Sequence, residues 1–405
     1  MKYYICVTPF FPSPQRWQGA YVLDQVKAIQ RNSNYEVVVF KTNALTHKEE
    51  DYEIQGVHVH PIRPLLMPSY LLNGLTGDLV GKLFVKKLRQ LGIKPKDVAF
   101  VHCHTANHAA FGFGVKRENI EAKVLIQFHD LDPYTLRNGI WAQKRWNIRY
   151  RAKKSLAAFN KADMLISISQ SVQDNLLAFP KARPQETYAS YLERLRCLTD
   201  FPPVRPNNLY VLYNGVDTTL FKSLNNSSTV TKQQLFRIGC VANFQELKDH
   251  ITLIKAFEIL HQEGYRNMVL SLLGSGPTKD ACYSYLQEHE LLEFVEWKEE
   301  ITHGKLPDYY NTLDLFVLPS IYEGFGCVYT EAYACGVPFM GVYGQGASEC
   351  IEPEERNLWL ISPHDYKQLA VLIAEYYEKR YKQNLRMKYD IDSLIIDFLK
   401  IIKTL

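Results

Sequence analysis

Short apolar segments alternate with longer amphipathic segments along the whole chain. The strand-like segments of the first half are 3–8, 35–41, 98–102, 124–128 and 164–168, with a helical pattern at 21–30. Those of the second half are 236–242, 268–273, 294–297, 315–318 and 338–342. Apolar runs of this length are typical of parallel strands that helices cover on both faces. We therefore predict an α/β fold with two Rossmann-like, doubly wound parallel sheets, which bind ligands at the carboxyl ends of their strands.

A polar stretch at 222–234, KSLNNSSTVTKQQ, separates the two halves and has the composition of a linker. A chain of 405 residues is long enough for two domains of ordinary size. We place the first domain at 1–222 and the second at 223–386, followed by a C-terminal helix within 387–405. Apolar residues of this last helix recur at helical spacing, which indicates packing against the protein.

Residues 313–338, LDLFVLPSIYEGFGCVYTEAYACGVP, carry the clearest indication of chemistry. They predict a buried strand, a glycine loop at 323–326 and a helix at 328–335. This arrangement directs free backbone N–H groups and the positive end of a helix dipole at a ligand, which suits a phosphate. Glu323 and Glu331 are carboxylates and would repel phosphate. We expect them to accept hydrogen bonds from the hydroxyl groups of a sugar and a ribose.

The same residues, in the form PS-x2-EGFG-x4-EA-x-A-x-G-x-P, resemble the E-x7-E signature of retaining glycosyltransferases of family 4, which have the GT-B fold. The alternative is a buried βα unit whose glutamates are surface charges. Two further segments match the family. VLYNGVD at 211–217, followed by Phe221, resembles its interdomain turn, and VANF at 241–244 with Lys248 resembles its first nucleotide-domain loop. The resemblance therefore covers nearly the whole chain.

This resemblance implies two Rossmann-like domains that face a cleft, with the 387–405 helix crossing back to the first domain. It also implies transfer of a sugar, with retained anomeric configuration, from a nucleotide-diphosphate sugar of the UDP or GDP type to an acceptor hydroxyl. No obvious nucleophile is present. The resemblance implies front-face displacement, in which the leaving phosphate helps to deprotonate the acceptor.

The resemblance also assigns roles to individual residues. Those expected to take part in catalysis are His129, Glu323 and Lys248. Those expected to bind the donor are Gly19, Asn243, Lys248, Gly274, Glu323, Gly324, Phe325, Gly326 and Glu331. The family usually has an arginine where Asn243 stands, so this chain has one cation fewer for the diphosphate. The turn at 344–349, GQGASE, resembles a family glycine turn that precedes the last helices.

Histidines at two strand ends of the first domain are further candidates. The resemblance implies that His102 and His104 line the acceptor side. His129 matches a family histidine near the donor sugar, where a neutral imidazole can accept a hydrogen bond from a hydroxyl group; a structural histidine is the alternative. Asp130 and Asp132 form a D-x-D sequence, which is a metal-binding motif in a different glycosyltransferase fold. We expect neither a metal nor another cofactor here.

Composition sets outer limits on the function. The chain is 46% hydrophobic and 22% charged, and its formal net charge of +4 is too small to indicate nucleic acid. Its eight cysteines are scattered without a CxxC pair, which is typical of reduced residues in a cytosolic protein. We find neither a signal peptide nor an apolar run approaching the ~20 residues of a membrane span. The expected location is cytoplasmic, peripheral on the inner face of the membrane.

The acceptor is predicted from charge. Residues 137–154 contain seven Lys and Arg, no acid and three interleaved aromatic residues, and a second basic stretch lies at 82–89. Such faces suit an anionic membrane surface, although two solvated helix faces are the alternative. If these basic faces bind a membrane, we expect the acceptor to be a lipid-linked or cell-surface glycan intermediate. The other hypotheses are a soluble acceptor, such as a sugar phosphate, thiol precursor or storage glucan, and a non-catalytic scaffold, which Asn243 favours.

Residues 181–208 depart from the family by their length. The run 186–198 has apolar residues at helical spacing and prolines on both sides. We predict an added helix on the first domain near the interdomain cleft, with a surface extension away from the site as the alternative.

Overall fold

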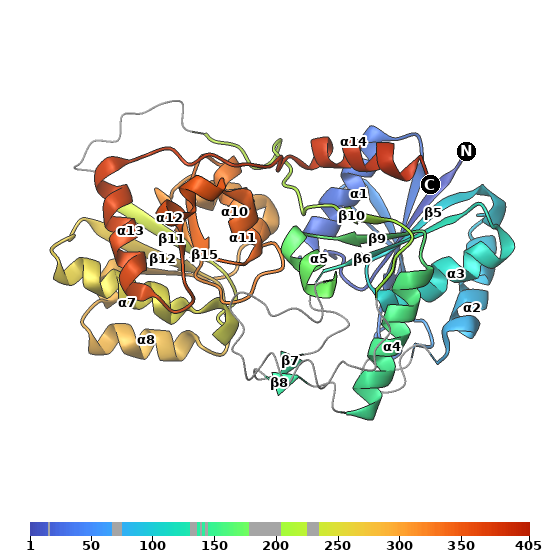
Figure 1. Ribbon diagram of the computed structural model, residues 1–405, viewed down its shortest axis with the longest axis horizontal. Helices are drawn as coiled ribbons and strands as arrows, with labels where there is room; N and C mark the ends of the chain where they lie inside the picture. Colours follow the sequence, from blue (N-terminus) through green and yellow to red (C-terminus); the bar gives the residue numbers. More distant parts are fainter. Residues whose placement is uncertain are drawn as a thin grey trace. The chain divides into compact units, whose positions relative to one another are not determined.

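The computed structural model describes residues 1–14, 17–66, 75–129, 136–137, 140–141, 145–177, 204–224 and 235–405. These form two compact units, residues 1–214 with 391–405 (unit 1) and residues 215–390 (unit 2). Each unit is built on its own sheet with helices packed against it (Figure 1). The predicted α/β fold with two doubly wound parallel sheets is confirmed.

Unit 1 contains an eight-stranded sheet in the order β10-β9-β6-β5-β1-β2-β4-β3, parallel except for the β3–β4 hairpin. Its strands are β1 (Tyr3–Thr8), β2 (Glu36–Thr42), β3 (Tyr52–Ile54), β4 (Val57–Ile62), β5 (Val98–Cys103), β6 (Lys123–Phe128), β9 (Met164–Ser167) and β10 (Leu209–Val211). Its helices are α1 (Ala20–Asn32), α2 (Gly77–Gln90), α3 (Ala109–Glu118), α4 (Trp146–Lys161), α5 (Gln170–Leu177) and α14 (Ile391–Ile402), with short 3-10 turns η1 (Pro95–Asp97) and η2 (Ala106–His108). A two-stranded antiparallel pair joins β7 (Leu136–Arg137) and β8 (Ile140–Trp141).

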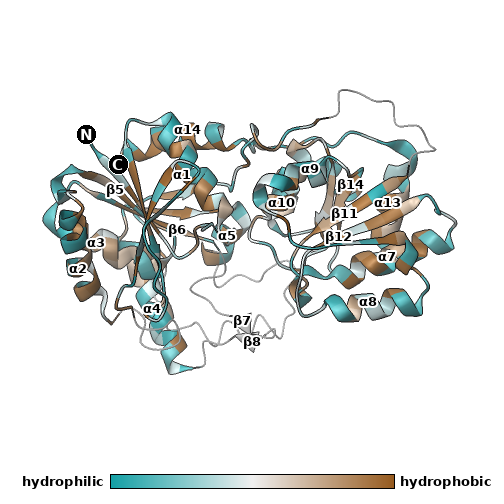
Figure 2. Cartoon of the chain, turned by 180° about the vertical axis from the view of Figure 1, so that it is seen from behind, coloured by the Kyte–Doolittle hydropathy of each residue, from teal (hydrophilic) through white to brown (hydrophobic). Residues whose placement is uncertain are grey.

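Alternation of side chains along β1 divides the apolar core of unit 1 into two layers. Tyr4 and Cys6 point to the layer that α1 and α14 cover, whereas Ile5 and Val7 point to the layer that α2 and α3 cover. Figure 2 shows the brown apolar strands between helices whose outer faces are teal. Helix α14, at the end of the chain, is therefore part of the core of the first unit.

Helices α2 and α3 cross at two glycines. A Cβ on Gly114 would lie 2.5 Å from Cα of Gly81, and a Cβ on Gly81 would lie 2.8 Å from the carbonyl oxygen of Ala110. Because real Cβ atoms do not come this close, only glycine permits this crossing. It sets the first turn of α2 directly against the first turns of α3.

Unit 2 contains a six-stranded parallel sheet in the order β13-β12-β11-β14-β15-β16. Its strands are β11 (Phe236–Val241), β12 (Met268–Leu273), β13 (Val295–Lys298), β14 (Leu315–Val317), β15 (Phe339–Val342) and β16 (Leu360–Ile361). Its helices are α7 (His250–Gln262), α8 (Lys279–Glu288), α9 (Leu306–Tyr310), α10 (Cys327–Ala334), α11 (Gly346–Cys350), α12 (Arg356–Trp359) and α13 (Tyr366–Lys379). Four 3-10 turns connect them: η4 (Glu246–Lys248), η5 (Leu292–Phe294), η6 (His303–Lys305) and η7 (Pro353–Glu355).

The boundary between the units differs from the one expected at 222/223. The structure divides the chain after Asn214, and residues 215–222 belong to unit 2. Val216 pairs with Asp390 as a β-bridge, and Phe221 is buried against His303 and Tyr310. At the other end, unit 2 extends to Asp390 rather than 386. These contacts, rather than the polar composition that follows them, fix the boundary.

Three predictions concern segments outside or at the edge of the described residues. The added helix expected at 186–198 and the D-x-D aspartates lie outside them. So do residues 225–234, which make up most of the expected linker.

Seven cysteines of the described part carry no disulfide, and six of these are buried. Within the described residues, the helices are too short or too polar for any to traverse a bilayer.

Candidate active site

The glycine loop of unit 2 connects β14 to α10 and is held by its own polar groups. Oγ of Ser320 lies 2.9 Å from the carbonyl oxygens of Leu247 and Tyr322, between which it shares its one proton. Gly326 precedes α10 with φ +81°, and a Cβ there would lie 2.6 Å from the ring of Tyr329. Since an L side chain would be strained at this position, glycine determines how the loop enters the helix.

Lys248 and Glu323 form an ion pair within the loop region. Their side chains are 25% and 12% exposed. Lys248 ends the turn η4, and Asp249 beside it has φ +50° and accepts a hydrogen bond from the hydroxyl of Thr252 at 2.7 Å. The structure therefore brings together two residues that lie 75 positions apart and that the sequence analysis assigned to catalysis.

Glu331 lies in α10 with its side chain 10% exposed. One carboxylate oxygen accepts from the hydroxyl of Tyr310 at 2.9 Å, and the other lies 3.8 Å from Nε2 of His303. Burial, with the charge of Glu331 adding, raises the pKa of Tyr310 well above its ordinary value, so the phenol stays a donor. Tyr310 thus orients a carboxylate that would otherwise be a costly buried charge.

Gln345 joins the glycine loop to the turn that follows β15. Its side-chain oxygen accepts from the backbone N–H of Glu323 at 3.0 Å, and its amide donates to the carbonyl oxygen of Ile321 at 2.9 Å. At Gly346, a Cβ would lie 2.3 Å from Cα of Phe325. Sequence reasoning noted the turn but missed Gln345. A glutamine between two glycines was the available signal.

Asn243 and Gly274 end adjacent strands, β11 and β12, and their loops are bonded together. The N–H of Phe244 donates to the carbonyl oxygen of Ser275 at 2.8 Å, and a Cβ on Gly274 would lie 2.1 Å from the carbonyl oxygen of Ala242. Asn243 itself is exposed. The two expected donor residues therefore lie at one edge of the sheet, Asn243 exposed and Gly274 buried against Ala242.

His250 lies beneath this edge and was not predicted. Its ring stacks on Phe244 with centroids 4.0 Å apart. Burial first, and then the charge of Lys248, lower its pKa to about 4. A neutral histidine therefore packs beside Lys248 without competing for an anion.

In unit 1, the three expected histidines form a stack at the carboxyl ends of β5 and β6. The ring centroids of His102 and His104 are 4.5 Å apart, and those of His104 and His129 are 5.2 Å apart. A hydrogen bond joins His104 Nδ1 to His129 Nε2 at 3.1 Å, and another joins the hydroxyl of Tyr4 to His102 Nδ1 at 2.7 Å. Burial lowers the pKa of both His102 and His129 to about 3 and that of His104 well below its ordinary value. The stack is neutral at pH 7.

Gly19 precedes helix α1 with φ +88°. A Cβ there would lie 2.6 Å from the carbonyl carbon of Phe10. The residue is therefore required by the close approach of two backbone segments within unit 1. Among the described residues, no group of three or more His, Cys, Asp or Glu is arranged to hold a metal ion.

Two family models match the chain. The model described as "Glycosyltransferase Family 4" covers residues 18–186, and the one described as "Glycosyl transferases group 1" covers residues 222–392. Among solved structures, sucrose-phosphate synthase from Thermosynechococcus elongatus matches with a TM-score of 0.70 at 17% identity, covering 100% of this chain and 99% of that one. HepE of Anabaena, in complex with UDP and glucose, matches with a TM-score of 0.65 at 17% identity, covering 99% of both chains. At such identities these structures establish the fold.

The chain belongs to the glycosyltransferases of the GT-B fold.

Curated relatives of this glycosyltransferase agree with that assignment. EpsF of Bacillus subtilis, named as a glycosyltransferase, is 33% identical over 138 residues, 32% of this chain and 35% of that protein. The capsular polysaccharide biosynthesis glycosyltransferase CapM of Staphylococcus aureus is 28% identical over 171 residues, 40% of this chain and 43% of its own length. The uncharacterized glycosyltransferase MJ1607 of Methanocaldococcus jannaschii is 24% identical over 376 residues, 87% of this chain and 86% of that protein. The matches to EpsF and CapM thus span less than half of those proteins.

Replacement of Gln345 by Ala should loosen the glycine loop of this glycosyltransferase. The variant loses two hydrogen bonds to the loop backbone, so we expect unfolding free energy to fall by about 1–2 kcal/mol and kcat to fall at least about tenfold. Gln383→Ala is the matched control, because Gln383 makes the same pair of bonds with the backbone of Phe339, at 3.0 and 2.8 Å, in strand β15. Equal losses of kcat in both variants would contradict a positioning role for Gln345.

The neutral histidine stack should make unit 1 sensitive to mild acid. Unfolded histidines bind protons below about pH 6.5, whereas the folded stack excludes them down to about pH 3. Stability is therefore complete above pH 6.5 and is lost as the pH falls, by up to about 1.4 kcal/mol per pH unit for each histidine. Thermal unfolding between pH 7 and pH 5 measures the slope. His102→Asn should reduce it, while replacement of the exposed His58 by Asn should leave it unchanged.

Proposed function

We propose that this glycosyltransferase transfers a sugar, with retention, from a UDP- or GDP-type sugar to a hydroxyl group of a lipid-linked or cell-surface glycan intermediate. The observation that carries the proposal is the Lys248–Glu323 pair in the glycine loop before α10. A cation and a carboxylate already in contact can separate to hold a diphosphate and a sugar hydroxyl. HepE, which has the same fold, was solved with UDP and glucose.

The donor side of the proposal is supported by the geometry of unit 2. The ammonium of Lys248 and the backbone amides of 324–326 would stabilise the diphosphate, on which charge grows in the transition state. Glu331, oriented by Tyr310, would accept from the ribose hydroxyls, and Glu323 from the sugar. Asn243 supplies an amide where the family usually has a cation. This places more of the phosphate stabilisation on Lys248 and the backbone.

In the proposed reaction, the bond between the anomeric carbon and the phosphate oxygen breaks while a bond to the acceptor oxygen forms on the same face. The acceptor proton passes to the leaving phosphate. This proposed step needs no protein nucleophile, metal or other cofactor. His129 would contribute as a neutral acceptor: its Nδ1 is buried and has no partner in the part of the chain that the structure describes, and its Nε2 is held by His104.

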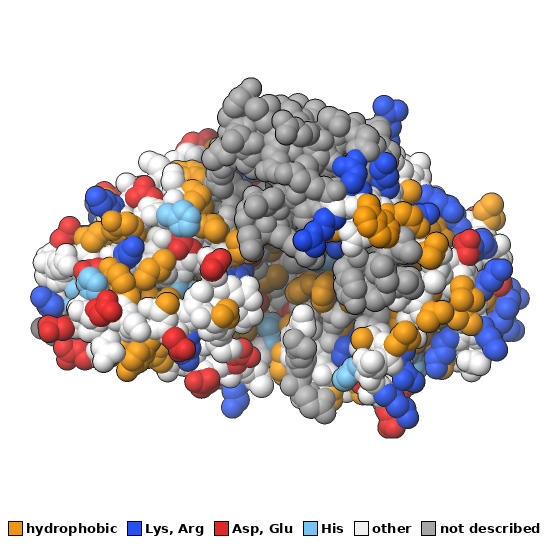
Figure 3. Space-filling view, turned by 90° about the horizontal axis from the view of Figure 1, so that it is seen from below, with side chains coloured by type: hydrophobic (Ala, Val, Ile, Leu, Met, Phe, Trp, Pro, Cys, Tyr) orange, Lys and Arg blue, Asp and Glu red, His pale blue; other side chains and the backbone are white. Residues whose placement is uncertain are grey.

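The nature of the acceptor is supported by unit 1 and by a relative. Exposed apolar side chains accompany the basic ones: Leu79 and Leu83 on α2 are 46% and 49% exposed, and Trp146 at the start of α4 is 65% exposed. Figure 3 shows Lys and Arg side chains with hydrophobic ones between them over unit 1. Such a face suits an anionic membrane, and CapM is named for capsular polysaccharide biosynthesis. We therefore propose a cytoplasmic protein that binds the inner face of the membrane peripherally, in part through 137–154.

The second candidate is a soluble acceptor, in keeping with the name of sucrose-phosphate synthase, which has the same fold. A non-catalytic nucleotide-sugar-binding protein is the third, which the exposed Asn243 favours. Release of UDP or GDP upon addition of acceptor would separate a catalyst from such a binder.

Lys248→Ala should lower kcat by about 10²- to 10³-fold, the magnitude found when a preorganised electrostatic partner is removed. The control is Lys382→Ala, which removes an exposed lysine of the same unit. Nuclear magnetic resonance of the product should show the anomeric configuration of the donor. An inverted product would exclude the proposed mechanism even if Lys248 proved essential.

Binding to vesicles should combine charge and apolar contact. Raising the salt concentration from about 0.1 M to about 1 M shortens the Debye length from about 10 Å to about 3 Å, so co-sedimentation with phosphatidylglycerol vesicles should weaken. Trp146→Ser should weaken it further at low salt. Ile120→Ser, at a site 77% exposed at the far end of α3, serves as the control. Binding that is absent, or that is unchanged by salt, would refute the membrane proposal.

A further inference from the structure

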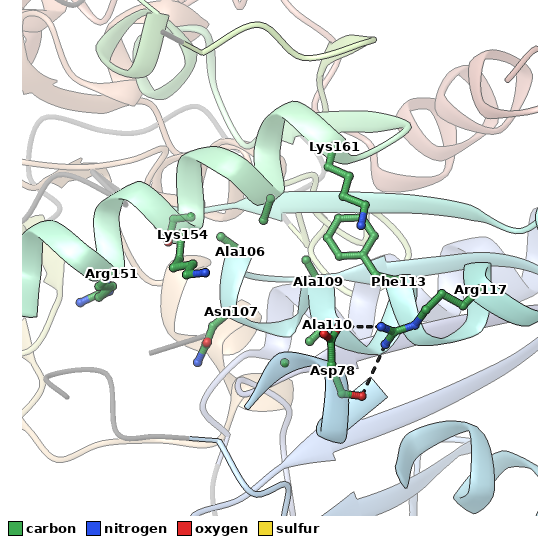
Figure 4. Close-up of a pocket in the computed structure, with 13 residues that line it drawn as sticks. Asp78, Ala106, Asn107, Ala109, Ala110, Phe113, Arg117, Arg151, Lys154 and Lys161 are labelled. Atoms are coloured by element: carbon green, nitrogen blue, oxygen red, sulfur yellow. Dashed lines mark hydrogen bonds and ion pairs between the residues drawn. The ribbon is translucent and has the colours of Figure 1, made fainter. Parts of the chain in front are cut away.

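A pocket on the helical face of unit 1 lies between the first turn of α2, the outer side of α3 and helix α4, with a volume of about 160 Å³ (Figure 4). None of the residues assigned above to donor binding or catalysis lines it. Among the residues that the structure describes, its charged lining consists of four cations and one acid: Arg117, Arg151, Lys154, Lys161 and Asp78. The pocket is therefore cationic in a chain whose overall charge is only mildly positive.

Helical spacing explains how the cations converge. Arg151, Lys154 and Lys161 are three and seven positions apart along α4, which puts them on one side of that helix. Figure 4 shows them in a row opposite Arg117 of α3. The floor is built from small residues, Ala106, Ala109 and Ala110, with Gly77 at the edge. The glycine crossing of α2 and α3 keeps this floor shallow and fixed.

The single acid neutralises only part of the charge. Asp78 is 89% exposed and accepts from Arg117 at 2.5 Å. A hydrogen bond from Arg117, and then the charges of Arg117, Lys161 and Lys82, lower the pKa of Asp78. Nζ of Lys161 lies 4.6 Å from the ring of Phe113, and Nζ of Lys154 lies 5.5 Å from the ring of Tyr150. Both ammonium groups thus retain donors for an anion at the pocket.

We propose that this pocket binds the phosphate group of a phosphorylated ligand. Lysine ammonium groups suit a tetrahedral anion with several acceptor oxygens, a guanidinium provides a donor fork, and the amide of Asn107 adds a neutral donor on the floor. The phosphate can belong to a lipid headgroup or to a soluble compound. This binding site is independent of the transfer reaction, so either proposal can fail while the other holds.

The first test is titration of the full chain with inorganic pyrophosphate by calorimetry, on a Lys248→Ala background that weakens the donor site. Lys154→Gln and Lys161→Gln should each weaken binding roughly tenfold, as expected for the loss of a charged hydrogen-bond donor. Lys94→Gln is the matched control, because it removes an exposed lysine of the same unit that does not line the pocket. Lys154→Arg should restore binding.

Absence of pyrophosphate binding, or an equal loss in Lys94→Gln, would overturn the proposal. The second test identifies the source of the phosphate with phosphatidylglycerol vesicles and with soluble glycerol phosphate. Vesicle binding that pyrophosphate competes away and that Lys154→Gln weakens identifies a lipid headgroup. Glycerol phosphate binding that depends on Lys154, with unchanged vesicle binding, identifies a soluble ligand. UDP binding measured without the Lys248 change reports the donor site separately.

Discussion

Parallel strands bring all their carboxyl ends to one edge of a sheet, and the arrangement of every candidate residue depends on this constraint. In unit 2 it collects the ends of β11, β12 and β14, so Lys248 meets Glu323, and Gly274 packs against Ala242, although these residues are far apart in sequence. In unit 1 it collects the ends of β5 and β6, which carry the three stacked histidines. Apart from His102 in β5, the strands carry none of the candidate side chains. They fix the starting point of each loop.

At the donor edge, the main electrostatic problem is to keep two glutamates close to a site for an anion. The protein treats them differently. Glu323 is neutralised by Lys248, a partner that a diphosphate can attract away, whereas Glu331 is bonded to Tyr310, which carries no charge. If the donor binds as proposed, its arrival would release the first carboxylate from Lys248, whereas Tyr310 already orients the second. Gln345 also holds the loop backbone through two hydrogen bonds, and it adds no charge to the site.

The repeated apolar runs were sufficient to predict both sheets, because buried parallel strands have a continuous pattern that polar loops interrupt. The runs at 3–8 and 268–273 coincide with β1 and β12. The β3–β4 hairpin was missed, since its strands are short and half exposed. The boundary was misplaced by eight residues because Phe221 and Val216 are held by tertiary contacts that composition does not reveal. Glu323 and Lys248 were found from motifs, whereas Gln345 and His250 act through contacts with segments distant in sequence. The two glycines beside Gln345 were a local signal, and His250 had none.

The two proposed anion sites, one at the loop of unit 2 and one on unit 1, would rely on different physical properties. The loop site uses few charges with partly buried donors, where low dielectric strengthens each interaction and salt screens it little. The α2–α3–α4 pocket uses several exposed cations, and salt screens these strongly. A ligand held by the first would be selected by geometry, and a ligand held by the second mainly by its charge and its local concentration. The second principle suits a surface that first meets an abundant anionic partner, and the first suits a site that must choose one donor.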